Sequence, residues 1–206
     1  MYNYNNIPTP SYVVHEELIK KNLEILKYVE ERSGAHILLA QKAFSMYYFY
    51  PLIGEYISGA TASGLYEAKL AYEEMGKENH IFSPAYRDEE FDEILTICDH
   101  IVFNSFHQWE KFKDKAIKAG RSCGIRINPE CSTQEHGIYD PCSPGSRLGV
   151  TKANFRPELL DGIEGLHFHT LCEQNSDDLE TTLNAVEEKF GEYMYGMKWK
   201  SEAKRS

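Results

Sequence analysis

Apolar positions along this chain form short runs that alternate with longer stretches in which they recur at helical spacing. Five short runs predict strands, at 36–41, 56–60, 79–83, 100–104 and 123–127. The stretches before and between them predict helices, at 16–32, 45–54, 64–76, 88–97 and 106–119. The predicted strands recur about every 20 to 23 residues, a spacing typical of compact strand–helix units with parallel strands.

The region 128–162 breaks this rhythm and predicts a long ordered loop, because it is rich in proline and glycine. Loops of that length in a compact domain are usually functional. A sixth strand at 163–170 follows, and then a helix from Asp177 to about Tyr195 with Ser176 as its N-cap. Ser11–Val14 predicts an additional short strand ahead of the first helix.

Repeated strand–helix units favour either a (β/α)₈ barrel or an open doubly wound sheet. In a dinucleotide-binding sheet the first strand runs into Gly-x-Gly-x-x-Gly, whereas here it runs into Gln41-Lys42-Ala43-Phe44. The sequence therefore predicts an α/β chain of the (β/α)₈ TIM-type barrel class. The barrel is expected to be incomplete, with six of its eight strands and the start of a seventh at 197–199.

The final residues, 200–206, contain no large apolar side chain, so they do not continue a seventh strand. We interpret them as a tail foreign to the barrel, and the chain as truncated. The predicted division is a strand segment at 1–14, a partial barrel at 15–199 and the tail at 200–206.

Composition narrows the range of partners. The chain has 206 residues and a net charge of −10, and it lacks a basic stripe, which disfavours nucleic acid and suits cationic small substrates. Its five cysteines form no Cys-x-x-Cys pair, which favours a reducing, cytoplasmic location. No signal-peptide pattern and no apolar run of membrane-spanning length is present.

Lys42 is the first candidate for chemistry, because it lies at the tip of an apolar strand. A lysine that loses solvation there becomes a reactive amine, as needed for a Schiff base with a carbonyl cofactor such as pyridoxal phosphate. The alternative is a lysine whose stem lies along the strand end while its amine reaches water.

His167 and His169 form the second candidate. Alternation along the strand puts both on one face with Gly165, where the end of a barrel strand carries catalytic groups. Three roles stay open for them: ligating a metal, stacking on a flat cofactor ring, or hydrogen bonding in the core. The metal role lacks a His-Glu-x-x-His motif and an inward carboxylate, so no metal site is predicted.

Two further residues are weaker candidates. Arg147 closes the long loop, where a guanidinium would hydrogen-bond a phenolate or carboxylate, although a surface arginine fits as well. Ser63 precedes a predicted helix and is first of all an N-cap, with a secondary role at the barrel mouth.

At these residues the sequence resembles the fold-type III pyridoxal-phosphate enzymes, the barrels related to alanine racemase and ornithine decarboxylase. The resemblance rests on the segments 39–44, 61–67, 82–86, 126–129 and 146–149. The segment Gly165–Glu173 is the most specific, and it is similar to the carboxynorspermidine/carboxyspermidine decarboxylases within that family. The resemblance covers residues 10 to 199, which correspond to the first half of a family-length protein.

The resemblance implies pyridoxal phosphate as cofactor and decarboxylation of a carboxylated polyamine to norspermidine or spermidine, as in polyamine biosynthesis. By position, Lys42 would be the Schiff-base lysine, His169 would stack on the cofactor ring, Arg147 would lie near its phenolic side, and Ser63 would face the cofactor. The strand at 11–14 would join a C-terminal β-domain, which this chain lacks. Family members act as homodimers.

This chain departs from the family after Trp199, where a glycine-rich phosphate-binding turn is expected. The carboxylate for the ring nitrogen is expected farther on. We therefore expect poor cofactor retention and negligible turnover by this polypeptide alone. The alternatives are a non-catalytic fragment, another racemase or decarboxylase of the same fold, and a metal-dependent hydrolase that uses His167 and His169.

Overall fold

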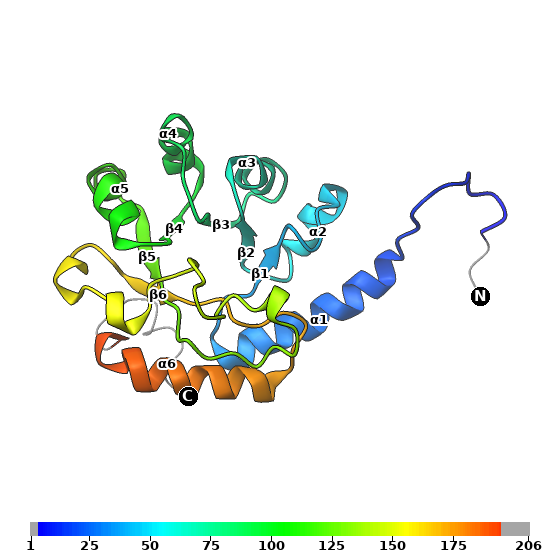
Figure 1. The fold of residues 1–206 in the computed structure, drawn as a ribbon. Coiled ribbons are helices and arrows are strands. Elements are labelled where there is room, and N and C mark those ends of the chain that lie inside the picture. The colour runs from blue at the N-terminus through cyan, green and yellow to red at the C-terminus, as the bar shows by residue number, and fades with distance from the viewer. Residues whose placement is uncertain (1–3, 195–206) are drawn as a thin grey trace.

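The computed structural model describes residues 4–194, which form a single parallel sheet and the helices around it (Figure 1). The six strands pair in chain order, each parallel to the next. They are β1 (Leu38–Ala40), β2 (Gly59–Ala62), β3 (Glu78–Phe82), β4 (His100–Phe103), β5 (Ser122–Arg126) and β6 (Gly165–His167). This order and orientation confirm the predicted barrel topology over six strands, as a partial barrel.

Six α-helices connect or flank the strands. They are α1 (Glu16–Ser33), α2 (Tyr50–Ile53), α3 (Leu65–Glu74), α4 (Asp88–Ile97), α5 (Phe106–Lys118) and α6 (Ser176–Met194). The strands follow an arc with α2 to α5 outside it, and α6 lies on the far side of the long loop (Figure 1). That loop contains three single 3₁₀ turns, at Gly137–Tyr139, Lys152–Asn154 and Pro157–Leu159.

Most predicted elements match the observed ones, and the differences have local causes. The strand predicted at 163–170 ends at His167, because its backbone then leaves the ladder. The helix predicted at 45–54 is a 3₁₀ turn at Tyr47–Phe49 followed by the four-residue α2, which has Pro51 at its start. The helix predicted to follow Ser176 includes that residue instead.

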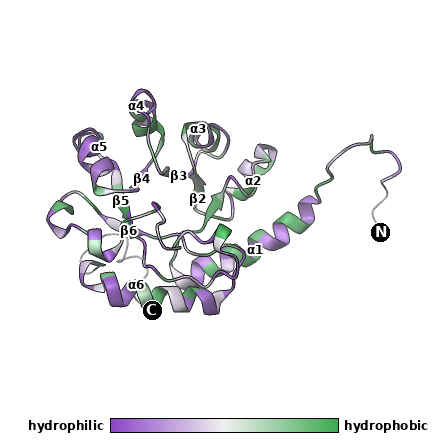
Figure 2. Cartoon of the chain, viewed as in Figure 1, coloured by the Kyte–Doolittle hydropathy of each residue, from purple (hydrophilic) through white to green (hydrophobic). Residues whose placement is uncertain are grey.

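An aromatic cluster fills the space between the sheet and the outer helices. Phe91 of α4 is fully buried and stacks on Phe112 of α5, with ring centroids 4.0 Å apart. Tyr86 and Phe103 pack against the same ring, and Tyr86 donates a hydrogen bond to the Val102 carbonyl oxygen at 2.8 Å. Helix α5, which contributes Phe112 to this cluster, shows much hydrophilic surface on its other sides (Figure 2). The amphipathic pattern of these helices thus fixes the outer layer.

The segment before α1 contains no strand, so the strand predicted at 11–14 is wrong. Tyr12 is 98% exposed and Val13 is exposed as well. A strand needs a neighbour to satisfy its backbone hydrogen-bonding groups, and the described chain offers none beside this segment. The predicted role of 1–14 in another domain stays a prediction.

Within the described residues, β1 and β6 each have one outer edge without a strand neighbour. Beside β1 lies an apolar groove lined from α1 by Ile19, Leu23 and Leu26, and from β1 itself by Leu39. The predicted seventh strand at 197–199 and the tail at 200–206 lie outside the described residues. No helix among the described residues is long and apolar enough to cross a membrane.

We expect replacement of Phe91 by Ala to lower the free energy of unfolding by about 3–5 kcal/mol, because it empties the centre of the aromatic cluster. Urea denaturation followed by circular dichroism measures the change. The matched control is Tyr72→Ala, at a residue of α3 that is 55% exposed, which should change stability by no more than about 0.5 kcal/mol. Equal losses in the two variants would contradict the assigned core.

Candidate functional site

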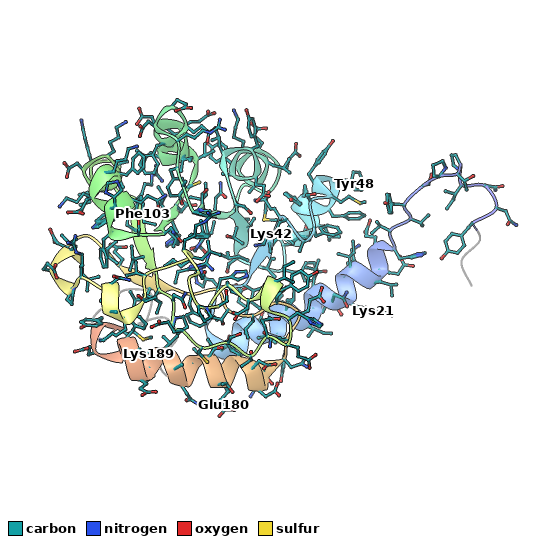
Figure 3. All side chains as sticks on the ribbon, in the orientation of Figure 1. Lys21, Lys42, Tyr48, Phe103, Glu180 and Lys189 are labelled. Carbon is teal, nitrogen blue, oxygen red and sulfur yellow. The ribbon has the colours of Figure 1, made fainter. Side chains whose placement is uncertain are left out.

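Lys42 is presented by a tight turn at the carboxyl end of β1. The amides of Ala43 and Phe44 both donate to the Ala40 carbonyl oxygen, at 2.9 and 3.2 Å. Gln41 is buried, and its side-chain oxygen accepts a hydrogen bond from the Tyr50 hydroxyl at 3.3 Å. These contacts hold the backbone on both sides of Lys42, which lies centrally between the helices and the long loop (Figure 3).

A cavity of about 430 Å³ opens at the carboxyl ends of the strands. Its volume lies within the usual range for small-molecule sites. Strand ends and loops that are far apart in the sequence contribute its walls, as expected for the functional face of a barrel. The polar and aromatic lining residues are Lys42, Thr61, Ser63, Phe82, Arg126, Tyr139, His167, His169 and Cys172.

Lys42 itself is exposed. The end of the strand was expected to take Lys42 out of water, and this expectation is wrong for the described chain. Within the described residues, the outer edge of β1 has no strand neighbour. Its place at the cavity mouth, rather than its burial, is what makes Lys42 the candidate amine.

His167 is held against Phe82, with the two rings stacked at a centroid distance of 5.3 Å. Its Nδ1 atom is buried and has no hydrogen-bond partner among the described residues. Burial lowers the pKa of His167 to about 3, and the positive charges of Arg126 and Lys42 act in the same direction. His167 is therefore a neutral imidazole in the physiological pH range.

His169 follows the end of β6 and is more exposed than His167. Partial burial and the charges of Lys42 and Arg126 lower its pKa as well. A neutral ring beside an amine is compatible with the predicted stacking role, which stays a prediction. The cluster of potential metal ligands that the described residues contain does not include His167 or His169.

Arg126 is the cavity residue that the sequence argument overlooked. It is the last residue of β5 and is buried, with only 4% of its surface exposed. Its guanidinium lies 4.7 Å from the centre of the Phe82 ring and donates a hydrogen bond to the His169 carbonyl oxygen at 3.2 Å. Burial lowers its pKa from the ordinary value. The signal in the sequence that could have identified Arg126 is a charged residue at the end of a buried strand.

Arg147, by contrast, is exposed and does not line the cavity, whereas its neighbour Leu148 does. Asn104 fixes this arrangement, because its side chain donates to the Arg147 carbonyl oxygen at 3.0 Å and accepts from the Gly149 amide at 2.9 Å. Gly149 has φ +81°, and a Cβ there would approach the Ile127 carbonyl carbon to 2.8 Å. The predicted role of Arg147 toward a cofactor stays a prediction.

Ser63 lines the cavity, but it is not the cap of α3. The N-cap is Gly64, and the side chain of Glu67 accepts a hydrogen bond from the Ser63 amide at 2.6 Å. The Ser63 side chain therefore lines the cavity rather than capping the helix.

A second, larger cavity of about 640 Å³ adjoins the first and shares Tyr139 and Cys172 with it. Its walls are the loops 133–139 and 172–178, which Gln134 and Gln174 join through a side-chain hydrogen bond of 2.6 Å. Three carboxylates line it, from Glu135, Glu173 and Asp178, and no lysine or arginine does.

The two cavities have opposite charge. Lys42 and Arg126 make the first one cationic, and no carboxylate of the described residues lines it. Pyridoxal phosphate requires an amine, a flat partner for its ring and donors for its anionic groups. Lys42, the two imidazoles and Arg126 meet those requirements in part, so the residues present fit this cofactor.

Comparison with known proteins supports a relationship over nearly the whole chain. No family model matches the sequence. A carboxynorspermidine/carboxyspermidine decarboxylase from Campylobacter jejuni is 46% identical over 196 residues, covering 95% of this chain and 51% of that protein. The crystal structure of carboxynorspermidine decarboxylase complexed with norspermidine, also from Campylobacter jejuni, has a TM-score of 0.84 at 44% identity. The matched region covers 93% of this chain and 49% of the chain in that crystal structure.

The chain is a homologue of the carboxynorspermidine/carboxyspermidine decarboxylases. A carboxyaminopropylagmatine decarboxylase from Synechocystis is also related, at 38% identity over 95% of this chain and 50% of its own length. The chain thus spans about half the length of the curated relatives that it matches. The predicted resemblance is confirmed over that half, together with the fold.

We expect His167→Gln to make stability less dependent on pH between about 6.5 and 3. The folded pKa of about 3 lies below the unfolded value of about 6.5, so the unfolded chain binds the proton first. The contribution of neutral His167 to the free energy of unfolding is fully present above pH 6.5. It is lost as the pH falls toward 3, by at most about 1.4 kcal/mol per pH unit. Urea titrations at several pH values measure it.

His107→Gln is the control, because His107 is exposed on α5, away from the cavity. It should leave the pH dependence as it is in the parent chain. An NMR titration that shows the His167 imidazole gaining a proton near pH 6.5 would contradict the assignment.

Proposed function

We propose that this chain carries the lysine half of a pyridoxal-phosphate site that decarboxylates carboxynorspermidine or carboxyspermidine to norspermidine or spermidine. The observation that carries the proposal is the position of Lys42. It lies at the mouth of a cavity lined by two neutral histidines and Arg126, in a chain 46% identical to such a decarboxylase.

When bound, the cofactor would supply an electron sink for the electron pair left at the substrate carbon as CO₂ departs. Lys42 would hold the cofactor through its amine and release it to the substrate amine. His169 would keep the ring oriented, and Ser63 would offer a hydroxyl to it. Arg126 would favour an anionic group in the cavity, because its own charge has no carboxylate partner there.

Neutral imidazoles suit this arrangement. A protonated His167 would add a third positive charge beside Lys42 and Arg126, and the low pKa of His167 prevents that. Lys42 must act as a nucleophile through the lone pair of its amine. A neutral imidazole beside it does not protonate that lone pair, as an imidazolium would, so the amine stays reactive.

The acidic cavity supplies the substrate preference. Glu135, Glu173 and Asp178 surround a space that opens beside the Lys42 cavity, and carboxylates attract the ammonium groups of a polyamine. Glu173 has a positive φ of 57°, which is uncommon outside glycine. We propose that this backbone conformation aims its carboxylate at the cationic tail of the substrate.

The chain spans about half the length of the relatives that it matches. We propose that the active form is a homodimer in the cytoplasm. All five cysteines are free thiols, which agrees with a reducing compartment. This chain alone would bind the cofactor weakly and turn over negligibly, because its lysine is exposed and it spans half of its relatives.

A second candidate substrate is carboxyaminopropylagmatine, since a decarboxylase of that substrate is 38% identical over the same span. Its guanidinium end would meet the same three carboxylates. Activity assays on a chain extended to the length of its relatives, with both substrates, would distinguish the candidates. A non-catalytic fragment remains the alternative if neither substrate reacts.

Lys42 is expected to be the site of covalent attachment of pyridoxal phosphate. Incubation with excess cofactor, reduction with borohydride and peptide mass spectrometry should find the modification mainly at Lys42. The variant Lys42→Arg should lose it while keeping the charge. The control Lys21→Arg, at an exposed lysine of α1, should not change the labelling. Labelling spread evenly over surface lysines would count against the proposed site.

Glu173→Gln is expected to weaken binding of norspermidine about two- to fivefold, because one exposed ion pair is lost. Isothermal titration calorimetry at low and high salt measures the change, and the difference should shrink at high salt. Glu180→Gln, on the exposed face of α6, is the charge-matched control (Figure 3). Equal effects of the two substitutions would show attraction to the whole acidic chain rather than to this cavity.

A further inference from the structure

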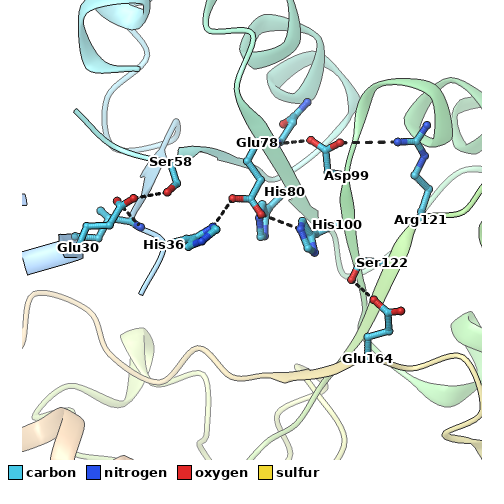
Figure 4. Close-up of polar contacts among 12 residues, drawn as sticks. Glu30, His36, Ser58, Glu78, His80, Asp99, His100, Arg121, Ser122 and Glu164 are labelled. Carbon is cyan, nitrogen blue, oxygen red and sulfur yellow. Dashed lines mark hydrogen bonds and ion pairs between the residues drawn. The ribbon is translucent and has the colours of Figure 1, made fainter. Parts of the chain in front are cut away.

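A second polar cluster lies at the opposite end of the strands from Lys42. Glu78 is the first residue of β3, His80 lies two positions farther on the same face, and His100 is the first residue of β4. His80 and His100 are direct neighbours in the β3–β4 ladder. Figure 4 shows both imidazoles beside the Glu78 carboxylate.

The ligating atoms of this cluster converge. One carboxylate oxygen of Glu78 lies 3.0 Å from Nε2 of His80 and 2.8 Å from Nε2 of His100. The two imidazole rings are stacked, with centroids 4.1 Å apart and planes 21° from parallel. One atom from each of the three residues lies within 4.8 Å of the others. Two nitrogens and one oxygen therefore face a common point.

His36 holds the carboxylate from its other side. Its Nδ1 lies 2.7 Å from the second carboxylate oxygen of Glu78, so both oxygens of Glu78 have imidazole neighbours. Glu30 of α1 fixes the chain next to His36 by accepting a hydrogen bond from the Ile37 amide at 3.0 Å. A hydrogen bond to the second oxygen of a ligating carboxylate is a common way to orient such a ligand.

This composition is unusual for its place in the fold. The interior of a (β/α) barrel is filled mainly by branched apolar side chains, which need no polar partners. Here one end of the interior holds a carboxylate and two imidazoles, whose side chains are 22–23% exposed. The cluster is thus sheltered but open to solvent, which leaves access for an ion and a position for water.

We propose that Glu78, His80 and His100 form a binding site for a divalent first-row transition metal, with zinc as the best match. Two imidazoles and one carboxylate are a donor set that zinc takes with a fourth, open position. Magnesium and calcium prefer oxygen ligands, so they fit poorly. Zinc–ligand bonds of about 2.0–2.2 Å place ligand atoms roughly 3.3 Å apart, and the observed 2.8 and 3.0 Å require only small movements.

Metal binding there would displace any proton held on the ligating atoms of Glu78, His80 and His100 and release it to solvent. The ion would connect the amino-terminal ends of β3 and β4, and through His36 it would also tie in the segment that leads to β1. The proposal does not rest on the decarboxylase function, because none of these residues lines the Lys42 cavity.

The test uses the untagged 206-residue chain, stripped with chelator and dialysed against Zn²⁺. Metal analysis should find about one zinc per chain, and Co²⁺ in its place should give the visible bands of a low-symmetry, four- or five-coordinate ion. Zinc should also raise the midpoint of thermal unfolding, because it binds the folded chain. A chain that takes up no zinc above the level of free solution would overturn the proposal.

Substitutions locate the site. His80→Gln and His100→Gln should each weaken zinc binding by more than the about 10- to 100-fold loss expected for the orienting variant His36→Gln. His107→Gln, at an exposed histidine of α5, should bind like the parent chain. Circular dichroism of each metal-free variant shows that it is folded. Zinc bound equally well by the double variant of His80 and His100 would place the metal elsewhere and refute the site.

Discussion

Parallel pairing of the six strands is the constraint on which the other features depend. Because every strand runs in the same direction, all carboxyl ends meet at one end of the sheet and all amino ends at the other. Arg126 lies 43 residues from His169 in the sequence and still farther from Lys42. All three line one cavity because their strands end on the same side of the sheet.

The same strands carry different chemistry at their two ends. Phe82 is the last residue of β3 and lines the cationic cavity. Glu78 is the first residue of β3 and lies beside two histidines. The spacing of four residues along one strand separates the two clusters by about 13 Å, at roughly 3.3 Å per residue. A single strand thereby contributes to two clusters at opposite ends of the sheet, and they are linked electrostatically, because the charge of His80 helps to lower the pKa of His167.

The hydrophobic pattern was sufficient to predict the order of the six strands and most of the helices, because each buried strand and amphipathic helix carries its own periodicity. It failed at 11–14, which forms no strand in the described chain. It was also sufficient to place Lys42 and His169 after the carboxyl ends of their strands, where both line one cavity. It could not distinguish Arg147 from Arg126, since that choice depends on Asn104, which binds the loop from a distant strand end. Nor could it predict that Lys42 is exposed, because exposure depends on what packs against β1.

The outer edge of β1 has a consequence for the order of folding. A closed barrel pairs its first strand with its last, so the strand that leaves the ribosome first would find its second neighbour only after the final strand is made. Until then, the backbone groups on that edge and the apolar groove beside it face water. Such an edge can accept an extended strand from another molecule. Synthesis of a barrel of this kind is thus a period of exposure whose length is set by translation speed.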